Sequence, residues 1–145
     1  IMDQFLFDLI CVNKFDSNHQ KILFQILNSR KFNISHAEEV DYQDHVNFVL
    51  NNKYKYWYII YLKNEIQGSV YITEDNFIGI SLIKDDKNLY KSIILKILQS
   101  HQPNPGIKSF RSKFFCINVS PNNLNLQVAA DELGLKKIQF TYSCN

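Results

Sequence analysis

Two aspartates and three lysines gather in one short polar stretch of the sequence, residues 83–92, which reads IKDDKNLYKS. The stretch follows an apolar run with strand character and precedes a run whose apolar residues have helical spacing. The first amides of a helix have no partner within the helix, and with the helix dipole they can bind a phosphate group. The turn is therefore the first candidate for an anion-binding site.

Two features of the turn weigh against tight phosphate binding. It contains no glycine, so side chains stand where backbone amides would have to approach phosphate oxygens. An aspartate at a helix start can also take the free amides itself, and its charge near a helix end is worth about 0.3–1 kcal/mol. Lys84, Lys87 and Lys91 partly offset that charge. An ordinary capped helix start is the alternative interpretation.

Among the histidines, His45 is the one with a candidate chemical role. Its ordinary pKa near 6.5 suits a base that deprotonates an amine. It also lies beside Val46 and Val49 on a helical face, where a structural histidine is common. The other histidines have no partner at metal-ligand spacing, so no metal site is predicted: His19, His36 and His101.

Composition excludes several classes of function. The 145 residues fit a single domain, residues 1–145, and the 16 Lys and Arg nearly balance the 14 Asp and Glu, so neither nucleic acid nor membrane is an expected partner. No run approaches the roughly 20 apolar residues of a membrane span. The three widely spaced cysteines favour reduced thiols in a cytoplasmic protein. The aromatic residues of 54–61 are interpreted as sheet core.

The elements that must position these residues follow from periodicity and turn signals. We expect strands over residues 4–12, 54–63, 66–74, 76–84, 110–119 and 135–143, and helices over 15–30, 40–52, 88–100 and 120–134. Asp16 or Ser17 and Asp41 are expected helix caps, and Gly134 a helix stop. Three consecutive strands followed by a crossover helix predict a mixed sheet with helices on both faces.

This order of elements resembles the GCN5-related N-acetyltransferase family over nearly the whole chain. YWYIIYLKNEIQGSVYI resembles its second and third strands, with Gly68 just after the hairpin, and NNLNLQVAADELGLKKI resembles its fourth helix. In that helix Asn123 and Gly134 agree with the family pattern, whereas Ala130 replaces a tyrosine. The resemblance implies an α/β (α+β) fold whose mixed, mostly antiparallel sheet is splayed between its fourth and fifth strands.

The resemblance also implies an enzyme that moves an acetyl group from acetyl-CoA, as co-substrate, to a primary amine. In the family the turn before the third helix holds the pyrophosphate, in a motif that falls here on residues 85–90, with Tyr90 in place of the second glycine. We therefore expect weak binding, strengthened by Asp85→Gln and Tyr90→Gly. The implied cofactor-binding residues are Leu82, Ile83, Lys84, Lys87, Asn88, Leu89, Tyr90, Lys91 and Asn123.

Within the family the chain is most similar to enzymes that acetylate amino groups of nucleotide-linked sugars, as in the pseudaminic acid pathway. Asn28 and His45 carry that similarity and are the implied substrate residues. An acetyltransferase for protein N-terminal amines and a non-catalytic binding domain are the alternatives. Because the usual acid is Ala130 here, the catalytic residues stay unassigned, with Tyr90, Tyr142 or a water as candidates. We expect the last sheet edge to be completed by a partner subunit, giving a homodimer, or to stay short.

Overall fold

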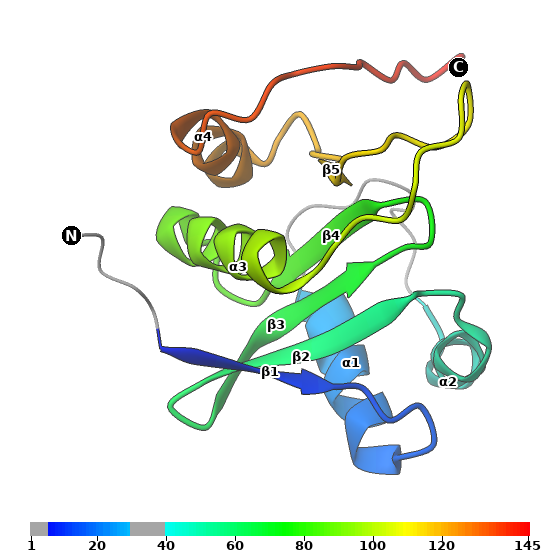
Figure 1. The fold of residues 1–145 in the computed structure, drawn as a ribbon. Helices are drawn as coiled ribbons and strands as arrows, with labels where there is room; N and C mark the ends of the chain where they lie inside the picture. The colour runs from blue at the N-terminus through cyan, green and yellow to red at the C-terminus, as the bar shows by residue number, and fades with distance from the viewer. Residues whose placement is uncertain (1–5, 30–39) are drawn as a thin grey trace.

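The computed structural model describes residues 6–29 and 40–145, and Figure 1 shows its fold. Residues 4–5 of the first expected strand, together with His36, lie outside the described residues. The elements in chain order are β1 (Phe7–Cys11), α1 (Ser17–Ser29), α2 (Tyr42–Asn51), β2 (Tyr56–Leu62), β3 (Glu65–Ile72), β4 (Phe77–Leu82), α3 (Lys87–Ser100), β5 (Cys116–Ile117) and α4 (Leu124–Glu132).

The five strands form one sheet in the order β1-β2-β3-β4-β5. Neighbours from β1 to β4 pair antiparallel, whereas β4 and β5 pair parallel. The parallel ladder consists of two pairs, Phe77 with Cys116 and Ile78 with Ile117, and the rest of β4 continues beyond it. This confirms the expected mixed, mostly antiparallel sheet whose fourth and fifth strands are neighbours.

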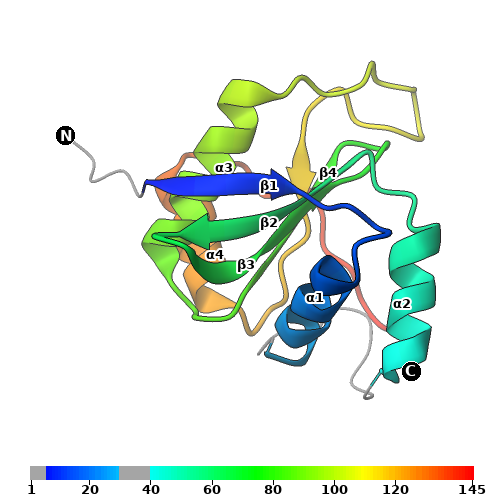
Figure 2. The ribbon, with the colours of Figure 1, turned by 90° about the horizontal axis from the view of Figure 1, so that it is seen from below.

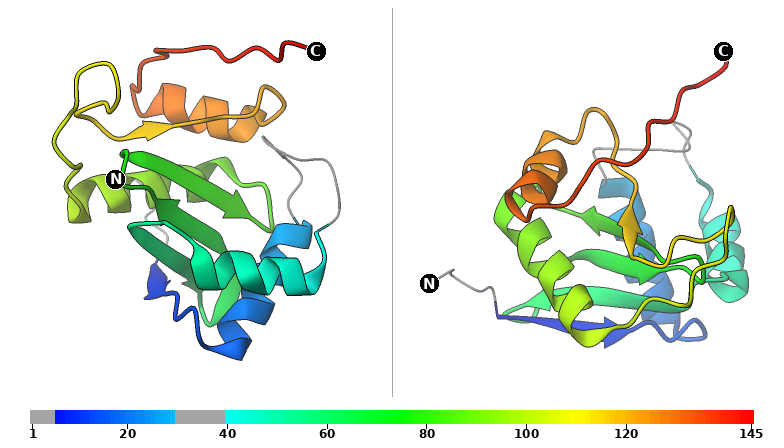
Figure 3. Two further views of the ribbon diagram at one scale, coloured as in Figure 1. Left: turned by 90° about the vertical axis from the view of Figure 1, so that its right-hand side faces the viewer. Right: turned by 45° about the horizontal axis from the view of Figure 1, so that its top comes forward.

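Helices cover both faces of the sheet, as expected, and divide the core in two. On one face lie α3 and α4 (Figures 1 and 3). Side chains of these helices, such as Ile93, Ile94 and Leu126, form one core cluster with Ile60 and Val70. On the other face lie α1 and α2, which Figure 2 shows on the side of the strands away from α3. Their apolar residues pack on β2 in a second cluster: Ile22, Leu23, Ile26, Val49 and Ile59.

The helix ends follow the sequence signals. Asp16 accepts hydrogen bonds from the amides of Asn18 and His19, and Asp41 caps α2 by accepting from the Gln43 amide. At the end of α4, Gly134 has φ +76°, and the amides of Gly134 and Leu135 bond back to the carbonyls of Asp131 and Ala130. Of the two candidates for the first cap, Asp16 and not Ser17 takes this role, and the expected cap Asp41 and the expected stop at Gly134 are confirmed.

Gly68 lies where the backbone of β4 leaves no space for a side chain on β3. Its φ is +156°, and a Cβ there would lie 2.0 Å from the carbonyl oxygen of Ser81. The register between β2 and β3 shifts at the same place, between Ile60 and Tyr61. Since no side chain fits this contact, the glycine just after the β2–β3 hairpin has a structural reason.

Near the C-terminus, one strand prediction holds only in part and the other is wrong. The strand expected over residues 110–119 contracts to Cys116–Ile117, and residues 135–143 form no strand in the described part of the chain. Ile138 is 74% exposed and Phe140 75%. Both segments have strand-forming residues, but a strand needs a partner for its peptide groups, and residues 135–143 have no partner strand among the described residues.

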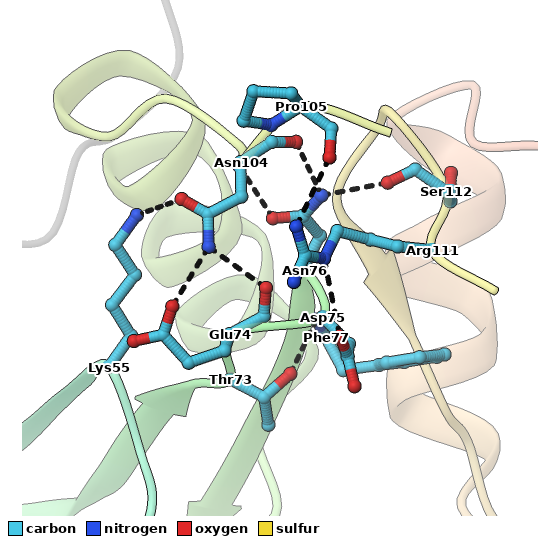
Figure 4. Close-up of polar contacts among 10 residues, drawn as sticks. All are labelled: Lys55, Thr73, Glu74, Asp75, Asn76, Phe77, Asn104, Pro105, Arg111 and Ser112. Carbon is cyan, nitrogen blue, oxygen red and sulfur yellow. Dashed lines mark hydrogen bonds and ion pairs between the residues drawn. The ribbon is translucent and has the colours of Figure 1, made fainter. Parts of the chain in front are cut away.

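The loop before β5 is held by the turn between β3 and β4 (Figure 4). Asn76 in that turn has φ +71° and is 1% exposed. Its side-chain amide donates to the carbonyls of Asn104 (2.9 Å) and Ser112 (2.7 Å), and its side-chain oxygen accepts from the Asn104 amide (2.7 Å). Asn104 in turn bonds to Glu74 and Lys55. The loop and the start of β5 are thereby fixed beside β4.

Among the described residues, a search for a helix long and apolar enough to cross a membrane finds none.

Candidate functional site

The turn from β4 into α3 places its aspartates differently from each other. Asp86 is the N-cap of α3, and its carboxylate accepts hydrogen bonds from the amides of Asn88 (2.9 Å) and Leu89 (3.2 Å). The next amide, of Tyr90, bonds to the Asp86 carbonyl at 3.1 Å. Asp86 therefore takes the amides itself, as the alternative interpretation of an ordinary capped helix start describes, and phosphate binding at this turn stays a prediction.

Tyr90, which replaces the second glycine of the expected pyrophosphate motif, is a residue of the core. It is 3% exposed, and its hydroxyl accepts a hydrogen bond from the side-chain amide of Asn123 at 3.2 Å. Burial raises the pKa of Tyr90, the Asn123 bond opposes that rise, and the nearby charge of Asp85 adds to it. Replacing Tyr90 by glycine would therefore open a cavity between α3 and α4, contrary to the expected gain in binding.

Asn123 links the two helices of this face. It is 5% exposed and caps α4 through a bond from the Leu126 amide to its side-chain oxygen, 3.1 Å long. Its side-chain nitrogen meets Tyr90. Both polar ends of Asn123 therefore have partners within the chain, and a ligand would compete with them.

Asp85 has one carboxylate oxygen that is buried and makes no hydrogen bond with the described residues. Its charge acts on the Tyr90 hydroxyl. The adjoining Ile83 is 37% exposed, and its amide donates to the Gln67 carbonyl at 2.9 Å, while Leu82 is 6% exposed in the core. The turn is thus anchored to β3 on one side and to α4 on the other.

Two of the three lysines near the turn are paired with one carboxylate. The Glu132 side chain on α4 binds Lys87 at 3.1 Å and Lys91 at 2.9 Å, both from α3. Hydrogen bonds from Lys91 and Lys87 lower the pKa of Glu132. Because the group is solvent-exposed, these bridges contribute little stability, but they direct both ammonium groups toward α4.

The two expected substrate residues lie on the α1 and α2 side of the sheet. His45 is 4% exposed, and its Nε2 atom lies 3.2 Å from the Gln20 carbonyl, to which it donates. Its ring packs on Phe24 with 5.3 Å between centroids, and burial lowers its pKa. Asn28 on α1 is exposed. The structure thus gives His45 a place in helix packing; its contact with a substrate stays a prediction.

The two tyrosines that the sequence suggests as candidate general acids lie in different surroundings. Tyr90 is buried against Asn123, and Tyr142 is 83% exposed in the C-terminal segment. The described residues contain no cluster of three His, Cys, Asp or Glu side chains suited to a metal ion.

A different tyrosine, Tyr71 of β3, lies over Gly79 of β4, its cross-strand partner. From the sequence, the contact between Tyr71 and Gly79 could have been inferred only from the alternation of side chains between the two faces of β3 and β4.

Comparison with solved structures finds one described as "The crystal structure of a possible acetyltransferase from Clostridium difficile 630". The likeness covers 95% of this chain and 95% of that chain, with a TM-score of 0.56 and 12% sequence identity. At that identity the likeness establishes the fold, which is acetyltransferase-like. No protein-family model matches the sequence, and neither does any curated protein.

Proposed function

We propose that this chain transfers an acetyl group from acetyl-CoA to a primary amine, with direct attack of the amine on the thioester. The observation that carries the proposal is the parting of β4 from β5 after Ile78, beside the start of α3, in a chain with an acetyltransferase-like fold. The acceptor we favour is an amino sugar linked to a nucleotide, on the strength of the sequence similarity around the exposed Asn28; His45 is buried in helix packing and adds no support.

The exposed side of β4 supports a place for the coenzyme's extended arm. The Cys116 amide donates to the Asn76 carbonyl, so the peptide groups of every second residue of β4 face the β5 side. Ile80 is one of these residues and lies past the last β4–β5 pair. The arm of acetyl-CoA carries two amide groups, which can pair with such a strand edge as another strand would.

The phosphate end of the coenzyme fits less well. Asp86 holds the amides of Asn88 and Leu89, and Glu132 holds Lys87 and Lys91. A pyrophosphate at this turn would meet the Asp86 charge and would have to displace its hydrogen bonds. We therefore expect binding of acetyl-CoA to be measurable but weak.

These same contacts favour a second candidate, a non-catalytic domain that keeps the fold and binds another ligand or partner. The two candidates differ in the fate of bound acetyl-CoA. An acetyltransferase releases free CoA when an amine is added, whereas the non-catalytic domain does not.

The test combines titration calorimetry with mass spectrometry. Acetyl-CoA is titrated into the chain, and CoA release is followed by mass spectrometry with a UDP-linked amino sugar or an alanine-initiated peptide as acceptor. Direct detection avoids thiol reagents, which would react with Cys11, Cys116 and Cys144. Binding with release supports the transferase, binding without release supports the second candidate, and absence of binding contradicts the first proposal.

The variant Asp86→Asn sharpens this test. Asparagine still caps a helix, so α3 keeps its start, but the negative charge is gone. We expect acetyl-CoA to bind about 2- to 5-fold more tightly at low salt, the equivalent of about 0.3–1 kcal/mol at a helix end. Asp44→Asn removes an equal charge from the first turn of α2 and serves as the matched control. Equal affinities in the two variants would show that Asp86 does not oppose the coenzyme.

A further inference from the structure

Tyr71 lies in a row of residues that crosses the sheet toward the exposed side of β4. Trp57 of β2 pairs with Tyr71, and Tyr71 pairs with Gly79. Directly paired residues of antiparallel strands point to the same face, which is here the face covered by α1 and α2, because Trp57 packs on the α1–α2 cluster. The row ends at Gly79, the first residue of β4 beyond its pairing with β5.

The Tyr71 side chain leans across β4 at this point. A Cβ built on Gly79 would lie 2.0 Å from Cζ of Tyr71 and 2.4 Å from its hydroxyl oxygen. The para end of the ring, and not its stem, therefore occupies the space above Gly79. The Tyr71 ring is also stacked on the ring of Tyr54, with centroids 4.1 Å apart and planes 7° from parallel. This stacking holds the orientation of the Tyr71 ring.

The other face of β4 is covered by the larger core cluster. Ile78, Ile80 and Leu82 point toward α3 and pack with Ile93 and its neighbours in the larger core cluster. Any molecule that reaches the parting of β4 and β5 from that face would have to displace the core. On the α1 and α2 face, Gly79 has no side chain of its own, and the end of the Tyr71 ring with its hydroxyl lies over it.

We propose that the Tyr71 hydroxyl contacts the acceptor amine; this rests on the proposed acetyl transfer at the parting of β4 and β5. In that reaction the amine nitrogen bonds to the thioester carbon, the carbon–sulfur bond breaks, the nitrogen loses one proton and the thiolate gains one. The Tyr71 oxygen accepts a hydrogen bond from the amine N–H and thereby points the nitrogen lone pair at the thioester. Tyr71 keeps its own proton throughout.

The first test is Tyr71→Phe, which removes the hydroxyl and keeps the ring stacked on Tyr54. We expect kcat/KM for the UDP-linked amino sugar or the alanine-initiated peptide to fall about tenfold, as for one lost hydrogen bond, with KM for acetyl-CoA unchanged. Titration of the acceptor without acetyl-CoA should show a similar loss of affinity. Tyr61→Phe is the matched control, since Tyr61 lies in β2 opposite Asp8 of β1.

The second test uses the contact with Gly79. A methyl group there would collide with the Tyr71 ring, so Gly79→Ala should lower kcat/KM for the acceptor. In a Tyr71→Ala background the collision is gone, and the same change should add little further loss. Circular dichroism of each variant checks that the chain still folds.

The outcomes separate the two proposals. If the unaltered chain transfers acetyl groups and Tyr71→Phe matches it in both acceptor kcat/KM and acceptor affinity, the role of Tyr71 is refuted while the transferase stands. If the unaltered chain releases no CoA with either acceptor, both proposals are overturned together. A loss confined to KM for acetyl-CoA would place Tyr71 on the coenzyme side and overturn its acceptor role.

Discussion

At the scale of single residues, Asn76 holds the loop before β5 in place with three side-chain hydrogen bonds from a backbone in the left-handed region. Asn76→Gly keeps the backbone conformation accessible but removes all three bonds. We expect the free energy of unfolding to fall by about 2–4 kcal/mol, because the peptide groups of Asn104 and Ser112 lose three hydrogen bonds to a side chain that is itself buried. Urea denaturation measures this change.

The matched control is Asn64→Gly. Asn64 also has positive φ (65°), in the exposed hairpin between β2 and β3. Glycine suits that conformation, so stability there should change by no more than about 0.5 kcal/mol. Equal effects at the two positions would mean that backbone conformation, and not the side-chain bonds of Asn76, matters in the turn.

At the scale of elements, two histidines join helices to their surroundings. His45 ties α2 to α1 through the Gln20 carbonyl, and His101 at the end of α3 bonds to the Tyr58 hydroxyl of β2 at 2.7 Å. Ser100 donates its proton to the Lys96 carbonyl, so it accepts from Nδ1 of His101, and Nε2 of that ring accepts from Tyr58. The acceptor role of Nε2 requires the neutral form of the His101 ring, whereas the bond from His45 to the Gln20 carbonyl can be donated by either form.

The pH dependence of stability follows from these helix contacts. Burial lowers the pKa of His45 and of His101, and the charge of Lys55 also lowers that of His101. In the unfolded chain these histidines have pKa values near 6.5. Their contribution to the stability of the fold is therefore complete above pH 6.5, and it is lost as the pH falls through their lower pKa values in the folded chain. Urea denaturation at pH 7.5 and 5.5 should show lower stability at pH 5.5, and His45→Gln combined with His101→Gln should reduce the difference. An unchanged difference in the double variant would contradict this assignment.

At the scale of the whole molecule, the segment after α4 presents alternate apolar side chains to solvent. Ile138, Phe140 and Tyr142 are 74%, 75% and 83% exposed. Alternation of this kind is typical of a strand with one apolar face, and the expected partner subunit would bury it. The prediction is a dimer by light scattering, converted to a monomer by Ile138→Asp with Phe140→Asp.

The control for that prediction adds the same charges at the alternate positions. Gln139→Asp with Thr141→Asp should leave the mass unchanged, because these side chains belong to the other face of the segment. A single-chain mass for the unaltered protein would contradict the dimer.

The sequence by itself determined the features that depend on near neighbours. Helical spacing predicted the helices α1 to α4. Local polar residues predicted the caps of the first two, Asp16 or Ser17 for α1 and Asp41 for α2, and Gly134 predicted the end of α4. The meander of β2, β3 and β4 was likewise predicted by short turns and apolar runs. Caps and tight turns are formed by residues within a few positions of one another, so their signals are present in the local sequence.

Tertiary structure alone decided the rest. Strand-forming residues over 135–143 stay unpaired because pairing requires a second strand, which composition cannot supply. Tyr90 packs in the core cluster, and its hydroxyl has a partner there only because Asn123, 33 positions away in the sequence, donates a hydrogen bond to it. Tyr71 reaches Gly79 only because two strands pair in one register. Such contacts join residues distant in the chain, and their geometry exists only once the sheet has formed.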